Sequence, residues 1–221
     1  MVAQVIRLPQ RAAEAAASAI TRPVRPLLAP FMVDDWGRDQ RFIDVVGPFA
    51  RLRWRVMVGG VHHLPSRHGA LLVVNDRQGS FSPLMAALAL SRVTKRPVRF
   101  AGRPDIAPAG PLLRRLGGIL ARPDEVRCAL AHGDLVIVST TEQASRQAGT
   151  VDHRLIQPAV LEHTTILPVA TLTHRVRRDA RVEIGAPIRH STKRKGPLAE
   201  VELADSTQSH LQRLLDGFGG F

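Results

Sequence analysis

The segment ALLVVNDRQGSFSP, residues 70–83, places polar side chains directly after an apolar run. Such a run predicts a strand buried on both faces, so the residues that follow would stand at one edge of a sheet. Asp76 is the first ionisable residue there. An apolar pocket would raise the pKa of its carboxyl and make it a general base, although the positive charge of adjacent Arg77 opposes that rise. The alternative, which we favour on sequence alone, is that Asp76 is an N-cap, accepting backbone N–H bonds where the chain enters a turn or a helix.

Other residue types with chemical potential are weaker candidates. His62, His63 and His68 lie close together, but no Cys or acidic residue stands at ligand spacing, so a solvated loop is the better interpretation. Cys128 has apolar neighbours within a predicted helix, which favours a core position over a nucleophile. GSFSP is not a hydrolase elbow, and no Gly-rich phosphate loop is present. We therefore predict no metal site and no cofactor.

The charge of the chain favours polyanionic partners. The formal net charge is +12 over 221 residues, which suits nucleic acid, anionic lipid or phosphorylated small molecules. Aromatic residues make up 4%, without Tyr, and no nucleic-acid-binding motif occurs, which argues against nucleic acid. The basic run Lys193-Arg194-Lys195 is then a solvated loop.

The expected location is the cytoplasm. A single cysteine favours a reducing compartment, and the N-terminus lacks the charged-then-apolar order of a secretory signal. No apolar run approaches the roughly 18 residues that a membrane span requires. A peripheral position on the inner face of the membrane stays open, because residues 1–35 form a basic, Pro-interrupted segment. Within it, Ile6, Leu8, Ala12, Ala16 and Ile20 would line one side of a short helix, either on anionic lipid or, as we prefer, packed on the body.

Residues 36–221 read as one α/β domain. Residues 36–57 are predicted to be helical, with a bend near Gly47-Pro48, and strands then alternate with helices. The predicted strands are Arg55–Val58, Ala70–Asn75, Val98–Ala101, Gly118–Ala121, Leu135–Ser139, Thr165–Ala170 and Arg181–Ile184. The predicted helices are Pro83–Val93, Pro111–Leu116, Pro123–Ala131, His153–His163 and Leu198–Leu215. This alternation predicts a single-domain layered fold with a largely parallel mixed sheet flanked by helices.

Four segments between Asp35 and Ile188 resemble, in order and spacing, the lysophospholipid (glycerolipid, PlsC-like) acyltransferase family. The family's first segment is a strand ending in Asn, then His-x4-Asp, then often Pro, and Asn75 and Pro83 match it. The resemblance implies that the His is a general base and that the Asp orients it. In this chain Asp76 stands at the His position. One residue is inserted, so the Asp position falls on Ser82, or on Phe81 without the gap.

The other three segments concern substrate binding. Gly118–Arg122 fits a basic segment that closes with Arg, and the resemblance implies that Arg122 holds the acceptor phosphate, aided by Arg103, Arg114 or Arg115. A solvated helix face explains Arg114 and Arg115 equally well. The third segment retains its strand but lacks the family's Pro-Glu-Gly, leaving Glu142 and Arg146 as displaced acceptor-site candidates. Ile166–Ala170 fits the family's late strand beside the cleft.

The resemblance implies acyl transfer from acyl-CoA or acyl-carrier protein to a lysophospholipid or glycerol-phosphate acceptor. A literal His-x4-Asp does occur at His174–Asp179, but it follows the fourth segment, where a loop tip is the better interpretation. Because both catalytic positions are altered, we expect weak or absent transferase activity. An inactive lipid-binding relative is the first alternative, and a basic nucleic-acid-binding protein is the second.

Overall fold

The computed structural model describes residues 33–77, 81–143, 147–173, 178–188 and 196–218. The predicted N-terminal amphipathic helix, Arg146, His174 and the basic run at residues 193–195 lie outside these described residues. Within them, one seven-stranded sheet has the order β1-β7-β6-β2-β5-β3-β4. The strands are β1 (Arg55–Gly59), β2 (Ala70–Val74), β3 (Val98–Ala101), β4 (Gly118–Ile119), β5 (Leu135–Ser139), β6 (Thr165–Thr173) and β7 (Asp179–Ile184).

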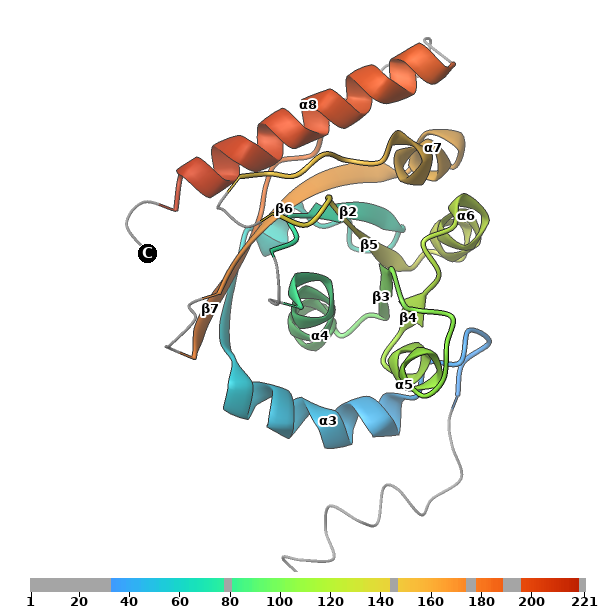
Figure 1. Ribbon diagram of the computed structural model, residues 1–221, viewed down its shortest axis with the longest axis vertical. Helices are drawn as coiled ribbons and strands as arrows, with labels where there is room; N and C mark the ends of the chain where they lie inside the picture. The colour runs from blue at the N-terminus through green and yellow to red at the C-terminus, as the bar shows by residue number, and fades with distance from the viewer. Residues whose placement is uncertain (1–32, 78–80, 144–146, 174–177, 189–195, 219–221) are drawn as a thin grey trace, which may run out of the picture.

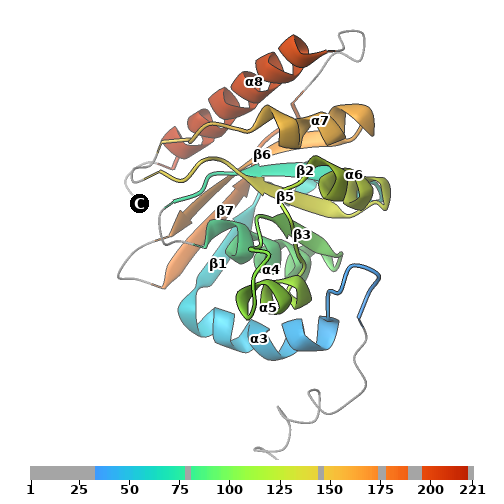
Figure 2. The ribbon, with the colours of Figure 1, turned by 45° about the vertical axis from the view of Figure 1, so that its right-hand side comes forward.

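The helices cover both faces of the sheet (Figure 1). On one face lie α3 (Gln40–Arg53), α4 (Ser82–Thr94) and α5 (Ala109–Arg115). On the other lie α6 (Pro123–Ala131), α7 (His153–Leu161) and α8 (Pro197–Asp216), as the turned view in Figure 2 also shows. The fold is therefore the predicted layered α/β arrangement with a mixed, mostly parallel sheet.

The centre of the sheet explains why the apolar runs in the sequence are continuous. All five residues of β2 are fully buried. Side chains of a strand alternate between faces, so Leu72 and Val74 pack in the core under α4 while Leu71 and Val73 pack under α6 and α7. The sheet departs from fully parallel only at one side, where β7 runs antiparallel to β6.

Two sequence predictions need correction. The helix predicted over residues 36–57 spans only Gln40–Arg53, because the Asp39 side chain caps its start by accepting the Phe42 N–H, and the chain is extended at Trp54. Cys128 is exposed rather than in the core. The buried side of α6 carries Val126, Ala129 and Leu130, and a residue at position 128 points away from that side.

A buried ionic cluster joins the first described residues to the sheet. Arg99, 1% exposed, lies near the start of β3 and bonds to Asp134 through Nε and to Asp34 through Nη2 at 2.7 Å. Its guanidinium also lies over the Trp36 ring, 5.4 Å from the centroid. Asp34 precedes the boundary between residues 1–35 and 36–221, so residues on both sides of that boundary meet at Arg99.

Candidate functional site

The topology of the sheet marks one place where a ligand site is expected. From β2 the chain crosses through α4, on one face, to β3; from β5 it crosses through α7, on the opposite face, to β6. Strands β2 and β5 are parallel neighbours, so their outgoing loops separate at their carboxyl ends. Open α/β sheets bind ligands in the crevice outside such a switch point. Asp76 and Glu142 stand in these two loops.

Hydrogen bonds continue the β2–β5 pairing beyond the strands and hold the two loops together. The Asp76 N–H donates to Thr140 Oγ1 at 3.2 Å, and the Gln143 N–H donates to the Asp76 carbonyl at 3.1 Å. Thr140 is 3% exposed and Asp76 is half-buried, so the first of these bonds is partly shielded from solvent. The backbone on both sides of the switch point is therefore held in place by these two hydrogen bonds.

Asn75 fixes the same loop from the other side. Its Oδ1 accepts the Thr171 N–H at 2.6 Å, and its Nδ2 donates to the Thr171 carbonyl at 3.0 Å. Thr171 lies on β6, the other neighbour of β2. The Asn75 side-chain amide therefore bonds to the backbone N–H and carbonyl of Thr171, as the backbone of a neighbouring strand would. Asn75, which the resemblance identified, thus acts here as a buried positioning residue.

The electrostatics of Asp76 are those of a potential base. Burial raises the pKa of its carboxyl above the usual range, and the nearby Glu142 carboxylate raises it further. The Arg77 N–H opposes this by bonding the ionised form, and the net direction is upward. Carboxyls whose pKa is perturbed by burial and by a specific neighbouring charge are candidates for functional residues. From the sequence, the charge of Arg77 was expected to oppose such a rise; the opposition comes from its backbone N–H, and the contribution of Glu142 was not foreseen.

The N-cap interpretation of Asp76 holds only in part, because Asp76 accepts a backbone N–H but does not cap α4. Helix α4 begins at Ser82, with Phe81 at its N-cap position and no side-chain cap, while Asp76 accepts the N–H of its own neighbour Arg77. Phe81 is 67% exposed and has a φ of +51°, an unfavourable conformation for a bulky residue. Ser82, the candidate for the orienting position, is 1% exposed in the first turn of the helix.

The predicted phosphate-binding arginines separate into two groups. Arg103 and Arg122 follow β3 and β4, so they stand at the same edge of the sheet as Asp76, and the Arg103 Nε is buried without a partner. Arg114 and Arg115 lie at the end of α5 and are engaged elsewhere. The first donates to the Trp36 carbonyl at 3.0 Å, and the second bonds to Asp39 at 3.2 Å.

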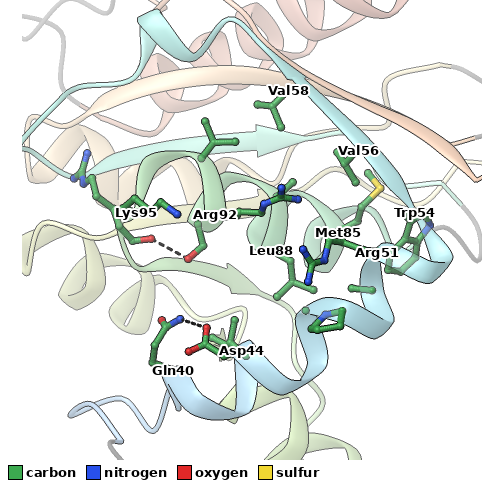
Figure 3. A pocket seen from close by; sticks show the side chains of 18 of the residues that line it. Gln40, Asp44, Arg51, Trp54, Val56, Val58, Met85, Leu88, Arg92 and Lys95 are labelled. Atoms are coloured by element: carbon green, nitrogen blue, oxygen red, sulfur yellow. Dashed lines mark hydrogen bonds between the residues drawn. The ribbon is translucent and has the colours of Figure 1, made fainter. Parts of the chain in front are cut away.

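A separate cavity of about 740 Å³, which the sequence analysis missed, lies between α3 and α4. Figure 3 shows Lys95 and Trp54 at opposite ends of its lining, with Arg92 and Leu88 between them. Apolar side chains from α3, β1 and α4 contribute, among them Ile43, Val56 and Met85. Their mixed spacing in the sequence gives no signal of a shared cavity, because the three elements meet only in the folded chain.

Comparison with known proteins identifies the fold. No family model matches the sequence, and no curated protein matches it significantly. Among solved structures, the 1-acyl-sn-glycerophosphate (LPA) acyltransferase PlsC from Thermotoga maritima superposes with a TM-score of 0.58 at 15% identity. The match covers 94% of this chain and 90% of that one. No helix of the described residues is long and apolar enough to cross a membrane. The chain thus has an acyltransferase-like α/β fold, with a carboxylate pair at its switch point.

Proposed function

We propose that this protein transfers an acyl group from an acyl thioester to the hydroxyl of a lysophospholipid or glycerol-phosphate acceptor. The fold is that of an acyltransferase at the level of topology. The observation that carries the proposal is the pair Asp76 and Glu142 at the switch point, where the pKa of Asp76 is raised. A carboxylate of raised pKa is a better proton acceptor than an ordinary one, so the chain has a base at the position where the resemblance places histidine.

In the proposed reaction, ionised Asp76 accepts the proton of the acceptor hydroxyl as that oxygen attacks the thioester carbonyl carbon. The carbon–sulfur bond then breaks, and the departing thiolate takes the proton from the Asp76 carboxyl. The negative charge of Glu142 favours the protonated form of Asp76 between these two steps. Asn75 is a positioning residue, because its bonds to Thr171 hold the loop that carries Asp76.

We propose that Arg103 and Arg122 attract the phosphate of the acceptor. Both stand on the edge of the sheet that carries Asp76, and guanidinium groups match phosphate oxygens. Arg103 supports this assignment better than the helix α5 arginines do, because its buried Nε has no partner among the described residues. Arg114 and Arg115 are assigned a structural role, because they bond to Trp36 and Asp39.

We further propose that the protein docks on an anionic membrane through α3 and β1. Phe49, Leu52 and Met57 are 65%, 63% and 57% exposed, and exposed Arg51, Arg53 and Arg55 alternate with them. Apolar side chains flanked by cations suit the interface of an anionic bilayer. Vesicles with and without phosphatidylglycerol would be sedimented with the double variant Phe49→Ser/Leu52→Ser, which should lose binding. Leu198→Ser, on the other face of the sheet, is the matched control, and equal loss in both would refute the surface.

Transfer itself is tested by incubating the full chain with acyl-CoA or acyl-carrier protein and lysophosphatidate or glycerol 3-phosphate. We expect turnover that Asp76→Asn reduces by about 10²–10⁴-fold, the usual contribution of a general base. Asp205→Asn, an exposed carboxylate on α8, should retain the full rate. Turnover unchanged in Asp76→Asn would exclude Asp76 as the base.

The second candidate is a lipid-binding protein without transferase activity. It is favoured by Ser82, which is buried in α4 at the position of the family's orienting Asp and is not a carboxylate. Under this alternative, lysophosphatidate binds and Arg103→Gln weakens binding, but no acyl product forms with any donor. If the unchanged chain forms acyl product faster than the Asp76→Asn variant does, this alternative is excluded.

A further inference from the structure

A buried cation beside the α3–α4 cavity lacks a counter-ion. Arg38 is 7% exposed and lines the cavity, yet no carboxylate forms an ion pair with it among the described residues. Its Nη2 donates to Ser91 Oγ at 3.0 Å, and its Nε is buried with no partner. Asp34, Asp44 and Asp134 lie near enough to favour its charge, but burial and Arg99 oppose it, and the pKa of Arg38 is lowered overall. Buried cations are normally paired, so this one is suited to an incoming anion.

The rest of the cavity has the same excess of positive charge. The lining contains one carboxylate, Asp44, which already accepts a bond from Gln40 at 2.8 Å. Arg96 is also occupied, because it donates to the carbonyls of Pro65, His68 and Gly133. In contrast, no hydrogen bond or ion pair joins the side chains of Arg51, Arg92 or Lys95 to another described residue.

Most of the charge in the lining lies toward one end of α4, and Arg51 is the cation toward the other end. Arg38, bonded to Ser91, lies with Arg92 and Lys95 around the last turn of the helix. Toward the other end, Met85 of α4 faces Trp54 and Val56, which follow α3 (Figure 3). From Met85 to Lys95 the helix rises about 15 Å, at 1.5 Å per residue. The cavity is therefore elongated, with Arg38, Arg92 and Lys95 toward one end and a mainly apolar lining with Arg51 toward the other, and its volume is within the usual range for ligand sites.

We propose that this cavity binds a long-chain fatty acid, with its carboxylate at Arg38 and its tail along Met85, Val56 and Trp54. The carboxylate would lie beside the Arg38 guanidinium and face Arg92 and Lys95. The anionic head lies near the end of α4 that is opposite its start at Ser82, so this site is distinct from the switch point at Asp76. It requires no acyl transfer and stands whether or not the proposed function holds.

The two tryptophans of the chain provide a direct test, because Trp54 lines the cavity and Trp36 does not. The probe is 9,10-dibromostearic acid, whose bromines quench the fluorescence of a nearby indole. In Trp36→Phe, where only Trp54 fluoresces, we expect saturable quenching. In Trp54→Phe, where only Trp36 fluoresces, we expect none. Equal quenching of both variants, or no saturation with Trp54 alone, would overturn the proposal.

The role of the charge is tested with the methyl ester of the same probe. We expect the ester to bind about 10- to 100-fold more weakly than the acid, the effect of losing a charge-assisted hydrogen bond. Arg38→Gln should weaken binding of the acid by a similar factor and leave the affinity for the ester unchanged. Arg127→Gln, an exposed arginine on α6, is the matched control. An acid and an ester of equal affinity would refute the carboxylate site.

The position of the tail is tested by filling the cavity. Ala89→Phe places a ring among the lining residues of α4 and should abolish quenching of Trp54, whereas Ala131→Phe, exposed on α6, should not. Thermal unfolding checks that each variant is folded. If Ala89→Phe does not fold, the comparison of acid and ester on Arg38→Gln still decides the proposal, because that change keeps a hydrogen-bonding side chain beside Ser91.

Discussion

The two ends of the central strands handle buried charge in opposite ways. Near the start of β3, Arg99 is bonded to two carboxylates, Asp34 and Asp134. At the carboxyl ends of β2 and β5, Asp76 stands beside another carboxylate, Glu142, and its pKa is raised. The first arrangement neutralises charge and stabilises the fold. The second leaves charge uncompensated, which costs stability and is expected where a group must exchange protons.

The largest expected effect on stability is at the start of β3, where Arg99 is paired with two carboxylates. Asp134→Ala removes one partner of a buried ion pair and should lower the free energy of unfolding by about 3–5 kcal/mol. Urea unfolding monitored by circular dichroism measures this. Asp205→Ala, exposed on α8, should stay within about 0.5 kcal/mol of the unchanged chain. A loss below about 1 kcal/mol for Asp134→Ala would remove the contrast between the two ends.

At the carboxyl end, neutral hydrogen bonds rather than ions should carry the stability. Asn75→Ala leaves the buried Thr171 N–H without its acceptor and should cost about 1–3 kcal/mol. The cost should be the same in low and high salt, because no ion pair is broken. A strongly salt-dependent loss in urea unfolding would show that this end also depends on charge pairing.

Asp76→Asn should stabilise the fold at neutral pH. Because the pKa of Asp76 is raised in the folded chain, its contribution to stability is present below the ordinary carboxyl pKa and is lost as pH rises through the folded value. The variant avoids that loss and keeps an oxygen for the Arg77 N–H. Each kcal/mol gained would raise Tm by about 2–4 °C. The gain should vanish near pH 3, and a lower Tm at pH 7 would contradict it.

The smallest effect concerns Glu142. Glu142→Gln removes a negative charge that raises the pKa of Asp76, so Asp76 should ionise at lower pH. The acid limb of the pH–rate profile of acyl transfer should then move to lower pH. Burial, the larger cause, is untouched, so part of the rise should persist. Glu162→Gln, at the C-cap of α7, should leave the acid limb in place.

Local patterns in the sequence predicted the elements but not the site. The apolar runs gave β3 and β5 with the observed bounds, and the helix predicted over Pro123–Ala131 is α6. The pairing of Asp76 with Glu142 depends on β2 and β5 being neighbours, which no local pattern encodes. The same holds for Arg38, whose isolation depends on where Ser91 and the carboxylates lie after folding. Cys128 was misplaced because apolar neighbours in sequence do not share its side of the helix.

The bonds of Asp34 determine how far the N-terminus can be shortened. This residue accepts the N–H groups of Trp36 and Arg38 and also binds the Arg99 guanidinium. A version of the protein starting at residue 36 would lose Asp34, one of the two carboxylates that pair with Arg99, and the turn that leads into α3. A version starting at residue 33 would keep both. Preparations that differ by three residues should therefore differ sharply in yield and resistance to proteolysis.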